Sequence, residues 1–191
     1  RRVLRPLAIL WVSAVLRSIV TESFVAFIPL FLYEKGHSLM AAGGAVSAFL
    51  FAGALAMMLG GHLSDLLDRR RVLLYPPLLA IPFVVLFLSG TGFLQVVALI
   101  LAGMLLYSSM AVTVAFAQEL MPESAGLASS LTMGMVWFTA SFAVTGVGAL
   151  ADRIGIGSAL GVTLLPLAGS ALLAFFLPRR AGEVASVGNS G

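Results

Sequence analysis

The sequence predicts an all-α integral membrane protein in which six transmembrane helices form two inverted sets of three. Three observations predict this fold class. The first is composition: 60% of the 191 residues are hydrophobic and 10% are charged, with a mean hydropathy of +1.09, whereas soluble domains carry about 25% charged residues. The second is a series of six apolar segments of membrane length. The third is a Gly-x-x-x-Asp motif that occurs twice.

Each of the six segments is long enough to cross a hydrocarbon core of about 30 Å, which takes roughly 20 helical residues. The predicted spans are residues 7–33, 41–63, 72–88, 93–117, 125–150 and 156–177. The connections between them are too short for a soluble domain, so residues 1–180 are predicted to form one six-helix bundle. Residues 181–191 are rich in Gly, Ser and Ala and are predicted to be a disordered cytoplasmic tail.

Basic residues gather at one end of the predicted bundle. Eight arginines precede the first span, follow the second or follow the sixth, and only Lys35 and Arg153 lie at the other end. Because cytoplasmic loops carry the excess of Lys and Arg, both ends of the chain are predicted to be cytoplasmic, in the cell membrane. Short basic clusters beside apolar runs are typical of membrane anchors, so the net charge of +3 does not indicate a nucleic-acid partner.

The repeated motif relates the two halves of the bundle. Gly61 and Asp65 close the second span, and Gly148 and Asp152 close the fifth, 87 residues later. Because three spans is an odd number, the two copies face opposite sides of the membrane. This pattern favours a three-plus-three inverted repeat, the architecture of secondary transporters. Chance is the alternative, since Gly and Asp are common at helix ends.

Two ionisable residues lie inside the first span. Arg17 and Glu22 are about 15 Å and 22 Å beyond Leu7 at a rise of 1.5 Å per residue. A charge at that depth costs at least ~2.5 kcal/mol, and such residues normally face a bundle interior or a cavity. Residues five apart point about 140° apart around a helix, so no simple intrahelical pair is expected.

These residues define the predicted transport site. Glu22 is a candidate for carrying a coupling proton, and Arg17 for holding an anionic substrate group or the charge of Glu22. Thr21, beside Glu22, completes this set. The alternative is an interhelical polar clamp with no role in transport. We expect the polar side chains of the first span to line a space that water reaches.

A second polar group lies on the fourth and fifth spans. The candidate cavity residues are Tyr107, Ser108, Ser109, Thr113 and Trp137. Hydroxyls here would bind a small polar ligand, although they also commonly join membrane helices. The third and sixth spans have few polar residues and are predicted to face lipid. The second and fifth are rich in glycine and are predicted to be the sliding faces of the bundle.

The most charge-dense stretch follows the second span and is predicted to be a tight turn at the water interface over residues 64–71. As a cytoplasmic gating loop it would comprise Gly61, Asp65, Arg69, Arg70 and Arg71. Asp65 is predicted to act as a breakable latch, by capping a helix or pairing with an arginine. For the three arginines, a topology anchor in a solvated turn is the favoured alternative.

This stretch resembles the signature of the major facilitator superfamily, in which Gly-x-x-x-Asp-Arg-x-Gly-Arg-Arg joins the second and third helices of each six-helix half. Here Leu66 stands where the family has Arg, and Asp68 lies near the usual Gly. The six spans resemble the C-terminal half of such a twelve-helix transporter. Residues 118–134, and Arg17 followed by Phe27 and Pro29, are similar to fosmidomycin-resistance-type efflux proteins.

The resemblance implies secondary active export of a small drug-like molecule or metabolite by alternating access. The energy source would be a proton gradient, with no cofactor. The implied partners are the lipid bilayer, the substrate and an N-terminal six-helix half. Because the chain begins with Arg and has no signal-peptide pattern, it is expected to be a fragment or a separated half of a larger protein.

Two other function classes are alternatives to a transporter. An intramembrane enzyme would need metal or phosphate chemistry from His37, His62, Asp65 or Asp68. The chain has no Cys, no His-Glu-x-x-His motif and no complete phosphotransferase pattern, so neither an enzyme nor a metal site is expected. A non-transporting six-span scaffold or dimerising unit stays open as the other alternative.

Overall fold

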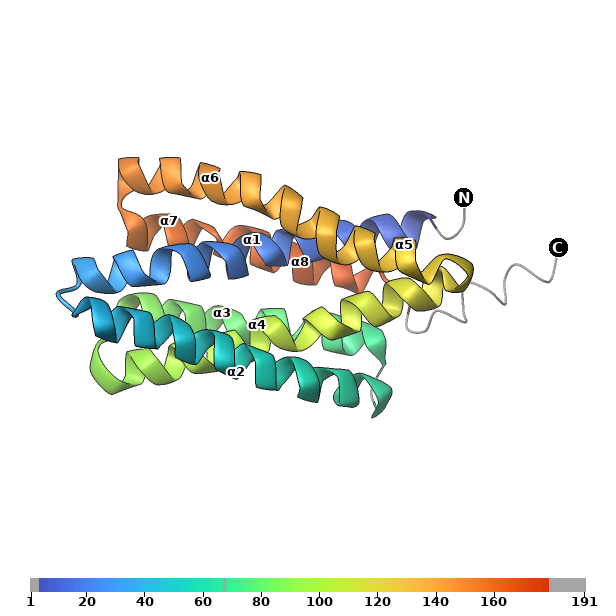
Figure 1. The fold of residues 1–191 in the computed structure, drawn as a ribbon, viewed down its shortest axis with the longest axis horizontal. Coiled ribbons are helices and arrows are strands. Elements are labelled where there is room, and N and C mark those ends of the chain that lie inside the picture. The colour runs from blue at the N-terminus through green and yellow to red at the C-terminus, as the bar shows by residue number, and fades with distance from the viewer. Residues whose placement is uncertain (1–3, 67, 179–191) are drawn as a thin grey trace.

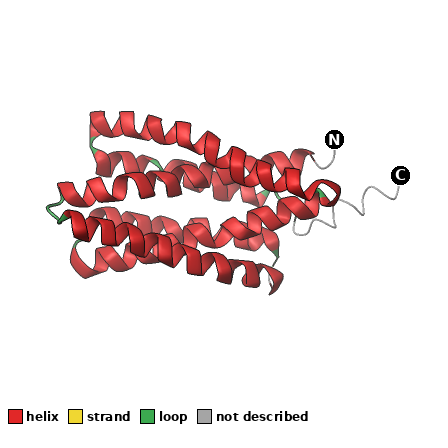
Figure 2. Cartoon of the chain, in the orientation of Figure 1, coloured by secondary structure: helices red, strands yellow, loops and turns green. Residues whose placement is uncertain are grey.

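The structure is a computed structural model that describes residues 4–66 and 68–178, without the side chains of residues 63–66. Every regular element in this part of the chain is a helix (Figure 2). Six helical segments are long and apolar enough to span a membrane: Leu4–Glu34, Leu39–His62, Arg69–Ser89, Gly92–Leu120, Pro122–Ile154 and Ile156–Phe175. The prediction of an all-helical protein with six membrane-length segments is therefore confirmed.

The elements run along the long axis of the molecule (Figure 1). They are α1 (Leu4–Glu34), α2 (Leu39–Leu66), α3 (Arg69–Ser89), α4 (Gly92–Leu120), the 3-10 turn η1 (Pro122–Ser124), α5 (Ala125–Ser130), the π-helical turn η2 (Leu131–Met135), α6 (Val136–Ile154), α7 (Ile156–Val162) and α8 (Leu164–Phe175). The fifth span thus runs from η1 to α6, and the sixth joins α7 to α8. The predicted tail at residues 181–191 lies outside the described residues.

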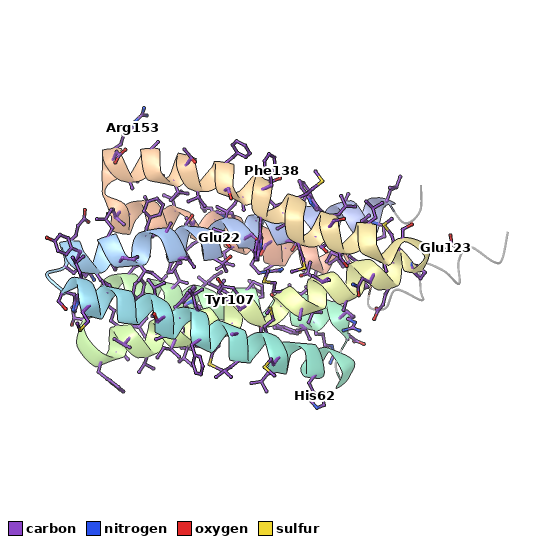
Figure 3. The ribbon with its side chains drawn as sticks, viewed as in Figure 1. Glu22, His62, Tyr107, Glu123, Phe138 and Arg153 are labelled. Atoms are coloured by element: carbon purple, nitrogen blue, oxygen red, sulfur yellow. The ribbon has the colours of Figure 1, made fainter. Side chains whose placement is uncertain are left out.

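The first helix of each set of three packs against the second and third helices of the other set. α1 packs against α6, α7 and α8 of the second set, and α4 packs against α2 and α3 of the first. The contacts of α1 with the second set therefore correspond to the contacts of α4 with the first set. α2 and α6 end at opposite ends of the bundle (Figure 1), where His62 and Arg153 are labelled in Figure 3. This is the arrangement that an inverted three-plus-three repeat requires.

Aromatic rings and close backbones hold the bundle together. Phe24, Phe49 and Phe87 are fully buried, and the ring centroid of Phe24 lies 6.2 Å from that of Phe49 and 5.9 Å from that of Phe87. α2 approaches α4 so closely that a Cβ added at Gly60 would overlap the carbonyl oxygen of Ser108. Such small residues let membrane helices pack tightly without a hydrophobic driving force between them.

Burial is uneven among the six spans. In the most apolar stretch of each span, the share of buried residues is 50% for α1 and 44% for α4, but 28% for the second span and 11% for the fifth. The spans predicted to be sliding faces are therefore the two most open. A large exposed apolar surface of this kind faces lipid or another part of the protein.

The connection between the second and third spans is shorter than the turn predicted over residues 64–71, so the predicted bounds are wrong. α2 continues to Leu66, and α3 already begins at Arg69, so the three arginines form the first turn of α3. Long basic side chains can reach water from a helix end as well as from a loop, and Arg is a good helix former. Gly61 also lies within α2. The side chain of Asp65 lies outside the described residues, so its role as a latch stays a prediction.

Candidate functional site

Arg17 is buried between α1 and α4. Its side chain is 5% exposed, and its Nη2 donates a hydrogen bond of 2.8 Å to Oγ1 of Thr113. Thr113 in turn donates to the carbonyl oxygen of Ser109 at 2.8 Å. In this conformation Arg17 forms the interhelical clamp that was the alternative to a transport role. Its binding of a substrate anion stays a prediction.

The polar side chains of α1 largely face other helices rather than an open space, contrary to the expectation of a water-lined face. Ser13 donates to the carbonyl oxygen of Ser170 on α8 at 2.8 Å, and Ser23 is fully buried. Thr21 is buried too and donates to the carbonyl oxygen of Ser18 at 3.1 Å. The hydroxyl of Ser13 thus makes an interhelical bond and that of Thr21 a local one, as is common in membrane helices. The buried hydroxyl of Ser23 has no hydrogen-bond partner among the described residues.

Glu22 differs from these residues because it is only partly buried. It lies about 18 Å before the end of α1 at Glu34, given the helical rise. It has no hydrogen bond or ion pair with another described residue, and it does not pair with Arg17. The hydroxyl of Tyr107 on α4 lies within electrostatic range of its carboxyl group. Figure 3 shows both residues near the middle of the bundle. Ionisable side chains at this depth normally face the bundle interior or a water-filled cavity.

A groove of about 510 Å³ opens next to Tyr107, between α2, α4 and the η2–α6 segment. Its lining residues are Leu50, Ala54, Met57, Tyr107, Met110, Ala111, Val114, Ala115, Gln118, Met133 and Trp137. The wall is apolar except for the phenol of Tyr107, the amide of Gln118 and the indole N–H of Trp137. Its volume is that of a site for a drug-sized molecule, and its methionines can adapt to different shapes.

The structure brings together two of the five predicted cavity residues. Tyr107 and Trp137 line the groove, whereas Ser109 and Thr113 are buried. Ser108 is half-buried and donates to the carbonyl oxygen of Leu105 at 2.8 Å. The helical period explains this separation, because residues spaced three or four apart share a face. α4 thus presents one face to the groove and another to Arg17.

The π-helical turn Leu131–Met135 was not predicted from the sequence. The indole Nε1 of Trp11 on α1 donates to the carbonyl oxygen of Leu131 at 3.1 Å, and Met133 of the same turn lines the groove. π-turns are rare and often occur at functional sites. A signal was present in the hydroxyl-rich residues that lead into the turn and begin it. Ser129 donates back to the carbonyl oxygen of Ala125 at 2.9 Å, and Thr132, inside the turn, donates back to that of Ala128 at 2.7 Å. Such back-bonding loosens helices.

The three arginines in the first turn of α3 each contact another side chain rather than being surrounded by water alone. Arg69 pairs with Glu119 of α4 at 2.5 Å, and the guanidinium of Arg70 lies 4.3 Å from the centre of the Phe175 ring of α8. Arg71 lies 3.4 Å from the carboxylate of Asp68. The first turn of α3 is therefore tied to two neighbouring helices. A gating role for these residues stays a prediction.

Comparison with known proteins agrees with this architecture. The model of the Major Facilitator Superfamily matches residues 10–189. The chain is 34% identical over 142 residues to the uncharacterized MFS-type transporter YfnC of Bacillus subtilis (strain 168), a match that covers 74% of this chain and 34% of that protein. It is 30% identical over 162 residues to the fosmidomycin resistance protein of Escherichia coli (strain K12), covering 82% and 38%. The chain thus spans little more than a third of the length of these relatives.

Proposed function

Because the chain belongs to the Major Facilitator Superfamily, a family of membrane transporters, we propose that it forms the C-terminal half of a proton-coupled exporter. The cargo would be a small drug-like molecule or metabolite, carried by alternating access. Similarity to a protein named for fosmidomycin resistance supports export of such a molecule. The basic end of the bundle supports a cell-membrane orientation with both ends of this chain in the cytoplasm.

The observation that carries this proposal is the position of Glu22. An unpaired, partly buried carboxyl group lies midway along a membrane-length helix and within electrostatic range of Tyr107, which lines the groove. When a proton binds to this carboxyl group, its charge is lost and the cost of holding it inside the membrane falls. Gain and loss of the proton therefore favour different conformations and link proton entry to the orientation of the groove.

The groove supports a substrate that is mostly apolar with a few hydrogen-bonding groups. Its apolar walls would exclude water from the body of the ligand, while Tyr107, Gln118 and Trp137 would orient it. Arg17 would keep α1 against α4 through Thr113, so that the proton-carrying residue and the groove move together.

We infer that an N-terminal six-helix half covers the open face of the second and fifth spans. These spans are the least buried of the six, and the chain covers 34% and 38% of the lengths of its two relatives. The second half would complete a cavity of which the groove is one wall. Together with the lipid bilayer and the substrate, it is the partner that the proposal requires.

The decisive experiment is Glu22→Gln in the transporter assembled with its other half. Everted membrane vesicles would be energised with a pH gradient, and transport of fosmidomycin and a panel of apolar dyes would be measured. We expect gradient-driven accumulation to be lost while exchange down a concentration gradient continues. Glu34→Gln is the matched control, because Glu34 lies exposed at the end of the same helix. Full gradient-driven activity in Glu22→Gln would exclude the coupling role, and no transport of any substrate by the unaltered protein would favour the scaffold alternative.

A further inference from the structure

A second pocket lies at the basic end of the bundle, between the start of α3 and the end of α8. It has a volume of about 210 Å³ and is lined by Asp68, Arg70, Arg71, Leu74, Tyr75 and Phe175. The residues that line the transport groove lie on α2, α4, η2 and α6, so the two sites are separate. The pocket belongs to the two spans predicted to face lipid.

The pocket holds more positive charge than the described side chains neutralise. Its carboxylate, from Asp68, lies 3.4 Å from Nε of Arg71. Arg70 has no carboxylate partner among the described residues, and its guanidinium rests on the ring of Phe175. Asp68 is also the N-cap residue of α3, yet its side chain makes no capping hydrogen bond. The N–H groups at this helix start add further positive character, so the pocket favours an anion.

Exposed apolar surface continues from the pocket along both helices. Tyr75 and Phe175 are 54% and 58% exposed, and the exposed residues farther along are Leu78, Leu79 and Leu172. Tyr at the boundary between charged and apolar surface is typical of the membrane interface. A free inorganic anion would use the arginines alone. A lipid would use the arginines and the apolar surface together.

We propose that this pocket binds the headgroup of an anionic phospholipid. Arg70 and Arg71 hold the phosphate, and the acyl chains lie along α3 and α8. Basic pockets between transmembrane helices on the cytoplasmic side bind such headgroups, and the orientation proposed above places this pocket there. Because Arg69 of the same helical turn pairs with Glu119 of α4, bound lipid also fixes the end of α3 relative to α4 and α8.

The test measures lipid binding directly. The full-length protein is purified in detergent, titrated with fluorescent phosphatidylglycerol and compared with phosphatidylcholine. Arg70→Gln is expected to weaken phosphatidylglycerol binding about fivefold, and Arg70→Gln with Arg71→Gln by more than about tenfold. Asp68→Asn is expected to strengthen it, because the competing carboxylate is removed. Arg153→Gln, exposed at the opposite end, is the matched control and leaves binding unchanged.

Three results would overturn the proposal: unchanged binding in the double variant, equal binding of phosphatidylcholine, or displacement of the lipid by inorganic phosphate alone. Arg70→Lys with Arg71→Lys keeps the charge and should keep most of the binding, which separates a lost site from a misfolded protein. The assay reads lipid binding and not transport. A failure of the proposed proton coupling would therefore leave its outcome unchanged.

Discussion

Arg17 and Glu22 lie on the same helix within the membrane, but in different surroundings. Arg17 is 5% exposed and donates to Thr113 on α4, whereas Glu22 is partly buried, has no hydrogen-bond partner among the described residues and lies within range of Tyr107. Their five-residue spacing turns them toward different sides of α1. The comparison teaches that charge at membrane depth is not enough to identify a transport residue, because the neighbouring residues decide whether the charged group joins two helices or is left without a hydrogen-bond partner.

The largest expected effect is on coupling, from Glu22→Gln. Moving one charge through 100 mV supplies about 2.3 kcal/mol, so loss of one coupled proton should lower the substrate accumulation ratio about 50-fold at that potential. The temperature of unfolding should not fall, since Glu22 makes no bond to another described residue that the change could break. Accumulation in vesicles and thermal unfolding in detergent measure the two effects. A large loss of stability with coupling intact would reverse the roles assigned to Glu22 and Arg17.

Arg17→Leu, unlike Glu22→Gln, should lower the stability of the folded protein. Removing a hydrogen bond that involves a charged group costs about 1.5–3 kcal/mol, and Thr113→Val removes the same bond from the other side. The double variant should therefore lose less than the sum of the single variants. Denaturant unfolding of the four proteins measures this cycle. Additive losses would show that the bond does not clamp α1 to α4.

Tyr107→Phe tests whether the groove near Glu22 binds substrate, because Tyr107 lines this groove. Loss of the hydroxyl should weaken substrate binding about three- to tenfold, as expected for one hydrogen bond, with little change in stability. Ser108→Ala is the control, because Ser108 is the next residue of α4, lies outside the groove and bonds to its own helix. Substrate-dependent fluorescence of Trp137 in the groove provides the measurement. Equal weakening by both variants would contradict the assignment of the groove.

Trp11→Phe has the smallest expected effect and tests the hydrogen bond that joins α1 to the π-helical turn. The change keeps an aromatic ring but removes the bond from Nε1 to the carbonyl oxygen of Leu131. We expect a loss of about 0.5–1.5 kcal/mol, together with faster amide hydrogen exchange in the π-helical turn. Exchange measured by mass spectrometry over residues 131–135 checks this. Unchanged exchange would mean that the turn does not depend on Trp11.

Hydropathy predicted the six membrane-length helices because apolar length is a property of each segment by itself. The charged residues Arg17 and Glu22 could also be found from the sequence, because their depth depends only on their position within one helix. The partner of Arg17 was not, since Thr113 is 96 residues away and only packing brings the two together. The start of α3 at Arg69 was missed because hydropathy marks where apolar residues end, not where a helix ends. The groove, too, depends on which face of α4 meets α2 and α6.

The measurement that tests the central claim most directly is cysteine labelling at positions 22 and 17 from the aqueous phase. The chain contains no cysteine, so Glu22→Cys and Arg17→Cys can each be labelled alone with a water-soluble maleimide in a cysteine-free background. We predict that Glu22→Cys reacts in at least one conformational state and is protected by substrate, while Arg17→Cys reacts far more slowly. Complete protection of position 22 in every state, with or without substrate, would contradict the account.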